Sequence, residues 1–216
     1  MNLKTFANEN KPALLRTVLI LAMIVLAAVV RLAPHPWNFT PVGAIALFSG
    51  AMVRDRCLAF LFPLLVMFTT DAIMGFNKLS LLVYASFLLS VLIGRAVVGA
   101  RFSLPRGTKG ASPRAKRESQ PESATGAKKR TLQRIAGATF LGSLQFFLVT
   151  NFGVWAFLTT YPRTPAGLAA CYLAGIPLFW NTLAGDAFYT TLLFGSFALA
   201  ERLSPILRQP TCRDAL

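Results

Sequence analysis

Residues 79–100 read LSLLVYASFLLSVLIGRAVVGA, a run in which Arg95 is the one charged residue. A helix needs about 20 mostly apolar residues to cross the hydrocarbon core of a bilayer, and this run reaches that length. Similar runs recur along the chain, in which 55% of residues are hydrophobic and 14% are charged. Because a soluble domain carries about 25% charged residues, the composition indicates a protein embedded in a membrane.

The apolar runs predict an all-α, polytopic membrane helix bundle. We expect one membrane domain over 1–216, with about six transmembrane helices near 13–33, 41–53, 57–75, 79–100, 135–158 and 178–200. Pro177 and Asn181 interrupt the last apolar stretch, so 166–176 is expected as an interfacial or re-entrant piece. Within 41–53, Ala46 and Gly50 are four residues apart, a spacing of small residues that lets helices approach closely.

The basic residues predict the orientation of the bundle. The net charge is +14, and residues 101–134, which are rich in Gly, Ser, Pro and Ala, are expected as a disordered basic cytoplasmic loop. If both termini are cytoplasmic, the outer side keeps only Arg31, Lys78 and Arg163 of the 22 Lys and Arg residues. The positive-inside rule therefore places both termini in the cytoplasm. It also explains the basic charge without nucleic acid as a partner.

The first apolar run, Val18 to Val30, follows a basic start and has two interpretations. It resembles the core of a signal peptide. However, the sequence after it, Arg31-Leu32-Ala33-Pro34, is a poor cleavage site, and further apolar runs follow. We therefore expect a retained first transmembrane helix.

Motifs for enzyme chemistry are missing from the sequence. Cys57, Cys171 and Cys212 show no CxxC or Cys/His spacing, so neither a metal site nor a disulfide framework is indicated. There is no HExxH, GxSxG or GxxxxGK[ST] motif. We expect a protein that is not an enzyme and needs no cofactor, although paired Asp71 and Asp186 carboxylates would be one route to intramembrane catalysis.

Polar residues in the predicted outer half of the bundle are the candidate binding site. Ionisable side chains inside a membrane are costly and indicate function. Asp186 is expected about 12 Å below the outer end of its helix, and it shares a helix face with Thr182 and Thr190 by i, i+4 spacing. The complete candidate set is Arg31, His35, Asn38, Asp71, Asn151, Trp155, Asn181 and Asp186.

Structural roles for the same residues remain open. Either aspartate has a possible ion-pair partner in Arg31, and Asn and Thr side chains often bridge packed helices. His35, the only histidine, lies between two prolines and is a candidate for fixing its loop by a hydrogen bond. Trp and Tyr are also common at both interfaces of membrane proteins.

Four stretches carry a resemblance to a known family. They are RLAPHPWNFTPVGAIALF at 31–48, TDAIMGF at 70–76, VTNFGVW at 149–155 and YPRTPAGLAACYLAGIPLFWNTLAGD at 161–186. The chain resembles a bacterial family of small integral membrane proteins of uncharacterised function. That family is distantly similar to the substrate-binding S components of energy-coupling-factor (ECF) vitamin transporters.

The resemblance implies a function. ECF S components have six helices, both termini inside and an outward-facing pocket. By this likeness, the chain is expected to bind a small polar molecule at the outer side of a bacterial inner membrane, as part of a transporter. The lipid bilayer, the small molecule and an ATP-driven energising module are the implied partners. The alternative is a structural or assembly membrane protein without a ligand.

Overall fold

The computed structural model describes residues 3–32, 36–99 and 124–204. The described residues form six α-helices and one π-helical segment, and they contain no strand. The elements are α1 (Leu3–Leu32), α2 (Val42–Met52), α3 (Arg56–Met74), α4 (Ser80–Ile93), η1 (Gly94–Val98), α6 (Ala124–Phe157) and α7 (Pro165–Leu203). The predicted all-α membrane bundle is confirmed.

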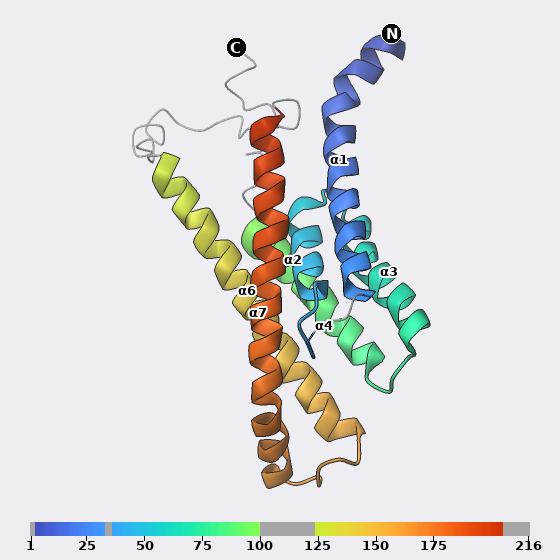
Figure 1. The fold of residues 1–216 in the computed structure, drawn as a ribbon, viewed down its shortest axis with the longest axis vertical. Coiled ribbons are helices and arrows are strands. Elements are labelled where there is room, and N and C mark those ends of the chain that lie inside the picture. The colour runs from blue at the N-terminus through green and yellow to red at the C-terminus, as the bar shows by residue number, and fades with distance from the viewer. Residues whose placement is uncertain (1–2, 33–35, 100–123, 205–216) are drawn as a thin grey trace, which may run out of the picture.

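Successive helices run in alternating directions through the bundle (Figure 1). The first residues of α1 and α6 and the last residues of α7 lie at its upper end in this view. The α3–α4 and α6–α7 connections lie toward the lower end. Helix α1 therefore begins at the end of the bundle where α7 ends. This agrees with the predicted placement of both termini on one side of the membrane.

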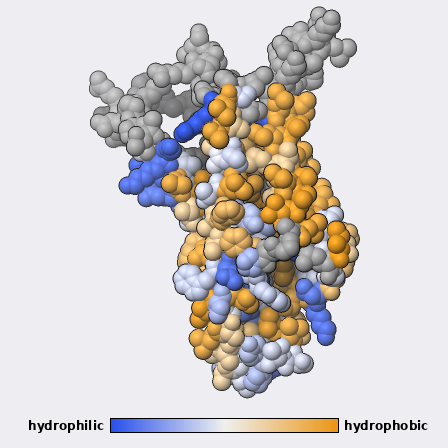
Figure 2. All heavy atoms as spheres, in the orientation of Figure 1, coloured by the Kyte–Doolittle hydropathy of each residue, from blue (hydrophilic) through white to orange (hydrophobic). Residues whose placement is uncertain are grey.

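The surface of the bundle is suited to lipid. Five helices are long and apolar enough to cross a membrane, and α2 is a shorter apolar helix. Hydrophobic side chains cover much of the visible side of the bundle, and hydrophilic residues gather near the start of α6 (Figure 2). On α1, Val18, Val25, Leu26 and Val29 are each at least half exposed. Because water would penalise such a surface, these faces fit the hydrocarbon core of a bilayer.

Helix α2 lies at the centre of the bundle and is too short to cross the membrane. Its 11 residues span about 16 Å, which is about half the hydrocarbon thickness. The predicted second crossing at 41–53 is thus a short helix preceded by the non-helical segment 36–41. Nearly all of α2 is buried.

Glycine residues allow α2 to lie close to α4 and η1, as expected from the small residues of the 41–53 segment. A Cβ on Gly50 would overlap the backbone of Val91, and one on Gly94 would overlap the backbone of Leu47. At the α2–α3 turn, the guanidinium of Arg95 donates to the carbonyls of Val53, at 3.3 Å, and Arg54, at 3.0 Å. These bonds satisfy carbonyl groups of the turn that joins α2 to α3.

Helix α7 is continuous where the sequence predicts a break at Pro177. Its 39 residues include the segment 166–176, which was expected as a separate interfacial or re-entrant piece. Inside a bilayer, a broken helix exposes unpaired backbone groups to hydrocarbon, so a proline within a membrane helix is tolerated more easily than a break. Helix α7 starts directly after the turn that joins it to α6. Thr164 Oγ1 accepts from Gly167 N at 3.1 Å as the helix cap, and Pro165 occupies the first turn.

Helix α6 begins at Ala124, whereas the sequence predicts its start at residue 135. Residues 124–134 of the predicted basic loop are therefore helical. Residues 127–134, AKKRTLQR, consist mostly of strong helix formers, which extends the membrane helix beyond its apolar part. The rest of the predicted loop, residues 101–123, lies outside the described residues.

Candidate functional site

Two adjoining cavities lie among α2, α4, α6, α7 and the segment before α2. The larger cavity, of about 200 Å³, lies mainly between α6 and α7. The smaller cavity, of about 30 Å³, lies deeper between α2, α4, α6 and α7. Asn38, Phe146 and Thr182 line both cavities. The two spaces are therefore neighbours that share part of their lining.

The larger cavity combines polar groups with aromatic rings. Asn38, Thr150, Asn151 and Thr182 supply its polar side chains. Phe146, Phe147 and Phe179 supply aromatic surface, and Phe147 and Phe179 contact each other with ring centroids 5.1 Å apart. A concave site with apolar walls and a few polar groups is the usual form of a small-molecule site.

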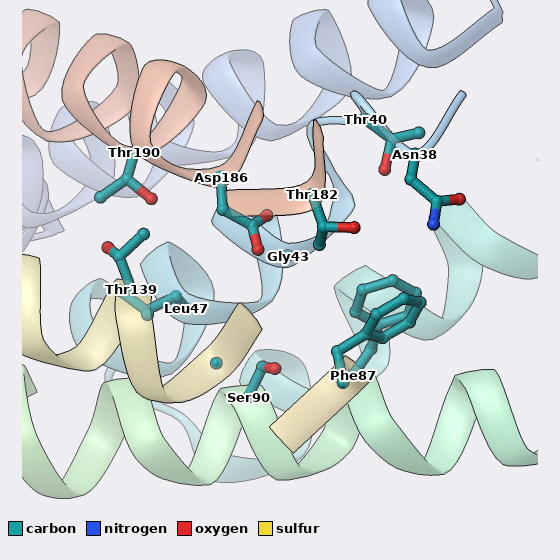
Figure 3. A pocket seen from close by; sticks show the side chains of 12 residues that line it. Asn38, Thr40, Gly43, Leu47, Phe87, Ser90, Thr139, Thr182, Asp186 and Thr190 are labelled. Carbon is teal, nitrogen blue, oxygen red and sulfur yellow. The ribbon is translucent and has the colours of Figure 1, made fainter. Parts of the chain in front are cut away.

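Asp186 lies at the smaller cavity, where α7 passes the first turn of α2 (Figure 3). The residue is 7% exposed, and Ser143 Oγ donates to its Oδ2 at 2.7 Å. The carboxylate contacts Gly43 so closely that a Cβ there would overlap it. Among the described residues, no Lys or Arg forms an ion pair with Asp186.

Threonine hydroxyls surround the same cavity (Figure 3). Thr139 Oγ1 donates to the carbonyl of Ile135 and Thr182 Oγ1 to that of Leu178, both at 2.9 Å. The hydroxyl of Thr190 is buried, and no partner for it occurs among the described residues. The predicted shared face of Thr182, Asp186 and Thr190 is therefore present and faces the cavity.

The segment before α2 brings Asn38 to both cavities. Asn38 has a φ of 63°, a left-handed conformation that asparagine adopts more easily than most residues. The turn is closed by Phe39 N donating to Pro36 O at 3.0 Å. Gly185 on α7 gives the backbone of Phe39 and Thr40 room to pack against that helix.

Asp71 and Arg31 lie in a separate cluster and not at the cavities. Arg31 Nη2 lies 3.1 Å from Asp71 Oδ1 in an ion pair. The Tyr84 hydroxyl donates to Asp71 Oδ2 at 2.8 Å, and Arg31 also contacts the Met67 sulfur. The cluster joins α1, α3 and α4, so Asp71 and Asp186 lie in different sites. A catalytic pair of these two carboxylates is therefore not supported.

The remaining candidates divide between the cavity and the ends of the helices. Asn151 lines the larger cavity, and its Nδ2 donates to Phe147 O at 2.9 Å. Trp155 Nε1 donates to Pro162 O at 3.0 Å, which holds the α6–α7 turn. Asn181 Nδ2 donates to Trp37 O at 3.2 Å, which holds the segment before α2. His35 lies outside the described residues.

Sequence reasoning missed the polar residues of α4 and α6 at the smaller cavity. Ser143 binds Asp186, Thr139 lines the cavity, and Gln145 Nε2 donates to Ser86 O at 2.9 Å and Ser90 Oγ at 3.0 Å. The signal was present, because Thr139 and Ser143, like Ser86 and Ser90, are four residues apart on apolar helices.

A family model matches residues 11–207, which include most of α1 and every later helix to the end of α7. The chain belongs to a family of unknown function (DUF6580). No curated protein and no solved structure matches the chain. The match covers both cavities and the Arg31–Asp71 cluster, so the whole candidate site belongs to the family's part of the chain.

Proposed function

We propose that this membrane protein captures a small polar molecule in the larger cavity, as the substrate-binding component of a transporter in a bacterial inner membrane. The observation that carries the proposal is a cavity of about 200 Å³ within a bundle of membrane-spanning helices, lined by amides, hydroxyls and aromatic rings. The space is half open at the side of the bundle, and polar side chains that line such a groove among apolar membrane helices indicate a ligand that they bind.

The lining indicates the chemistry of the molecule. Ligand sites usually measure about 300–1,000 Å³, so a cavity of about 200 Å³ suits a compact ligand. Phe146, Phe147 and Phe179 offer surface for a ring or a short apolar body. Asn38 and Asn151 offer both donors and acceptors, and Asp186 beyond them favours a ligand whose inner end is cationic or donates hydrogen bonds.

The expected likeness to ECF S components would imply the same function, since those proteins bind their substrates in an outward-facing pocket. An energising partner would then supply the ATP-driven step. One departure concerns α1, where S components often carry small residues at i, i+4 for docking. The run from Val18 to Val30 has only Ala22, Ala27 and Ala28 as small residues. Docking of such a module would need a different surface.

A structural or assembly role is the second candidate function. It is favoured by the Arg31–Asp71–Tyr84 cluster and by Trp155 and Asn181, whose side chains bind other parts of the chain. These five residues behave as packing groups. They do not account for the larger cavity, so we rank this role below capture.

Native mass spectrometry tests the proposal. The full chain in lipid nanodiscs is incubated with a small-molecule extract of the expression host, and bound masses are measured after release. Val154→Phe adds volume to the lining of the larger cavity, whereas Leu148→Phe adds it on the exposed face of the same helix. We expect a bound mass below about 300 Da in the wild type and in Leu148→Phe, and a loss of at least tenfold in Val154→Phe. Equal occupancy in both variants, or no bound mass in the wild type, would contradict capture.

A further inference from the structure

We infer that the smaller cavity is a binding site for a compact monovalent cation, held by Asp186 and the surrounding threonine hydroxyls. The cation is either an alkali ion or the ammonium group of a larger molecule, because both present a water-sized positive charge to oxygen atoms. The inference concerns the smaller of the two adjoining cavities. A site for an alkali ion does not rest on the proposed capture, whereas a site for an ammonium group would hold the inner end of the captured molecule.

The charge of Asp186 is the first argument. A carboxylate in the membrane interior is tolerated where a cation, water or several donors reach it. The structure gives this one a single side-chain donor, Ser143, and no cationic partner among the described residues. The first turn of α2 at Gly43 offsets part of the charge through the helix dipole, equivalent to about half an elementary charge. One positive charge in the adjoining cavity would complete the compensation.

The hydroxyl groups supply the second argument. Thr139 and Thr182 donate their protons to carbonyls of their own helices, so their remaining lone pairs act as acceptors. The buried Thr190 hydroxyl has no partner among the described residues, although buried hydroxyl groups are normally satisfied. All three residues line the cavity together with Asp186 (Figure 3). Converging oxygen acceptors are the environment that hard cations prefer.

The size and charge of the site select the class of cation. A volume of about 30 Å³ holds one or two water-sized particles, which excludes a quaternary ammonium ion such as choline. One carboxylate, partly compensated by α2, balances a single positive charge. A calcium-type site uses more carboxylates and six to eight oxygens, so the site is not suited to a divalent ion.

Thermal unfolding of the full chain in nanodiscs tests the inference without any captured ligand. The unfolding midpoint is measured in choline chloride and then with increasing lithium, sodium, potassium or methylammonium chloride at constant ionic strength. Because a ligand that binds only the folded state stabilises it, at least one compact cation should raise the midpoint by several degrees and saturate. Choline should not.

Three variants assign such an effect to the cavity. Thr190→Val keeps the shape and removes the unpartnered oxygen, and it should weaken the cation response at least tenfold in concentration. Asp186→Asn should abolish the response. Thr191→Val is the matched control, because that neighbouring hydroxyl is exposed on the other face of α7 and donates to Ala187 O, and its response should equal that of the wild type.

The pattern of active salts identifies the source of the cation. A response to alkali ions assigns an inorganic ion, and a response to methylammonium alone assigns an ammonium group. If no compact cation raises the midpoint of the wild type, the inference is wrong. It is equally wrong if Thr190→Val and Thr191→Val respond alike, and this comparison holds even if Asp186→Asn fails to fold.

Discussion

At the scale of single residues, the two membrane aspartates differ in how their charge is compensated. Asp71 has an ion pair with Arg31 and a hydrogen bond from Tyr84. Asp186 has one donor, Ser143, and an adjoining cavity. Asp71 is therefore expected to contribute to stability, whereas Asp186 is expected to contribute to binding.

A double-mutant cycle tests the structural role of Asp71. Removing one partner of a buried ion pair costs about 3 kcal/mol, because the other charge stays buried without compensation. We expect that loss in unfolding free energy for Asp71→Asn and for Arg31→Gln. The loss in the double variant should be smaller than the sum of the two single losses. Asp55→Asn is the control, since Asp55 is exposed and asparagine also caps helices well. Additive losses in the cycle would show that the pair does not couple.

The candidate residues could be chosen from the sequence, but their partners could not. Charged and amide side chains in apolar helices stand out by residue type alone, and Asn38, Asn151 and Asp186 do line the cavities. From the sequence, Arg31 had two possible ion-pair partners, Asp71 and Asp186, both predicted in the outer half of the bundle. Its choice of Asp71 depends on the contact of α1 with α3, a packing detail that helical periodicity does not encode.

At the scale of elements, α2 organises the bundle because it contacts every other described helix. Its contacts include α1, α3, α4, α6, α7 and η1. Small side chains allow this position, since Gly43 faces Asp186 and Gly50 faces Val91. A short helix can be fully buried in this way without crossing the bilayer itself.

Gly50→Ala tests the close crossing of α2 and α4. The new methyl group would overlap the Val91 backbone, and overpacking of this kind costs about 1–3 kcal/mol. We expect a lower unfolding midpoint for this variant. Gly195→Ala on α7 is the matched control, because nothing lies within 4 Å of its Cβ position and alanine favours helix. A destabilisation by Gly195→Ala as large as that by Gly50→Ala would show that the crossing is not the cause.

Helix locations were predictable from hydrophobicity, whereas helix ends were not. Helices α1, α3, α4, α6 and α7 each overlap an apolar run of the sequence, because a helix in lipid needs about 20 apolar residues. The early start of α6 and the continuity of α7 through Pro177 arise where hydrophobicity carries no information. Helix propensity decides the first case, and the need to pair backbone groups inside the bilayer decides the second.

At the scale of the whole molecule, the charge distribution and the helix order indicate the same orientation. Lys78, in the α3–α4 connection, and Arg163, in the α6–α7 connection, belong to the end that the sequence places outside (Figure 1). Lys128, Lys129, Arg130 and Arg134 lie on the first turns of α6, at the end that the sequence places inside. The larger cavity would then be reached from the outer side of the membrane.

Cysteine accessibility can report this orientation, but the native cysteines are poorly suited to it. Cys57 is exposed, whereas Cys171 is buried, and its Sγ lies 3.3 Å from Asn151 O. The burial of Cys171 leaves no path for a reagent from water. A cysteine introduced into the larger cavity replaces it as a reporter.

The most direct test of an outward-facing polar cavity is the labelling of Thr150→Cys in a chain without its native cysteines. A small, permanently charged methanethiosulfonate is added to intact cells, and the labelled fraction is measured by mass spectrometry. Thr150 lines the larger cavity, whereas Leu148→Cys, on the exposed face of α6, is the control. We predict rapid labelling of Thr150→Cys from outside and little labelling of Leu148→Cys, which faces lipid. Labelling of Thr150→Cys only after the inner side is opened, or at the same rate as Leu148→Cys, would contradict the account.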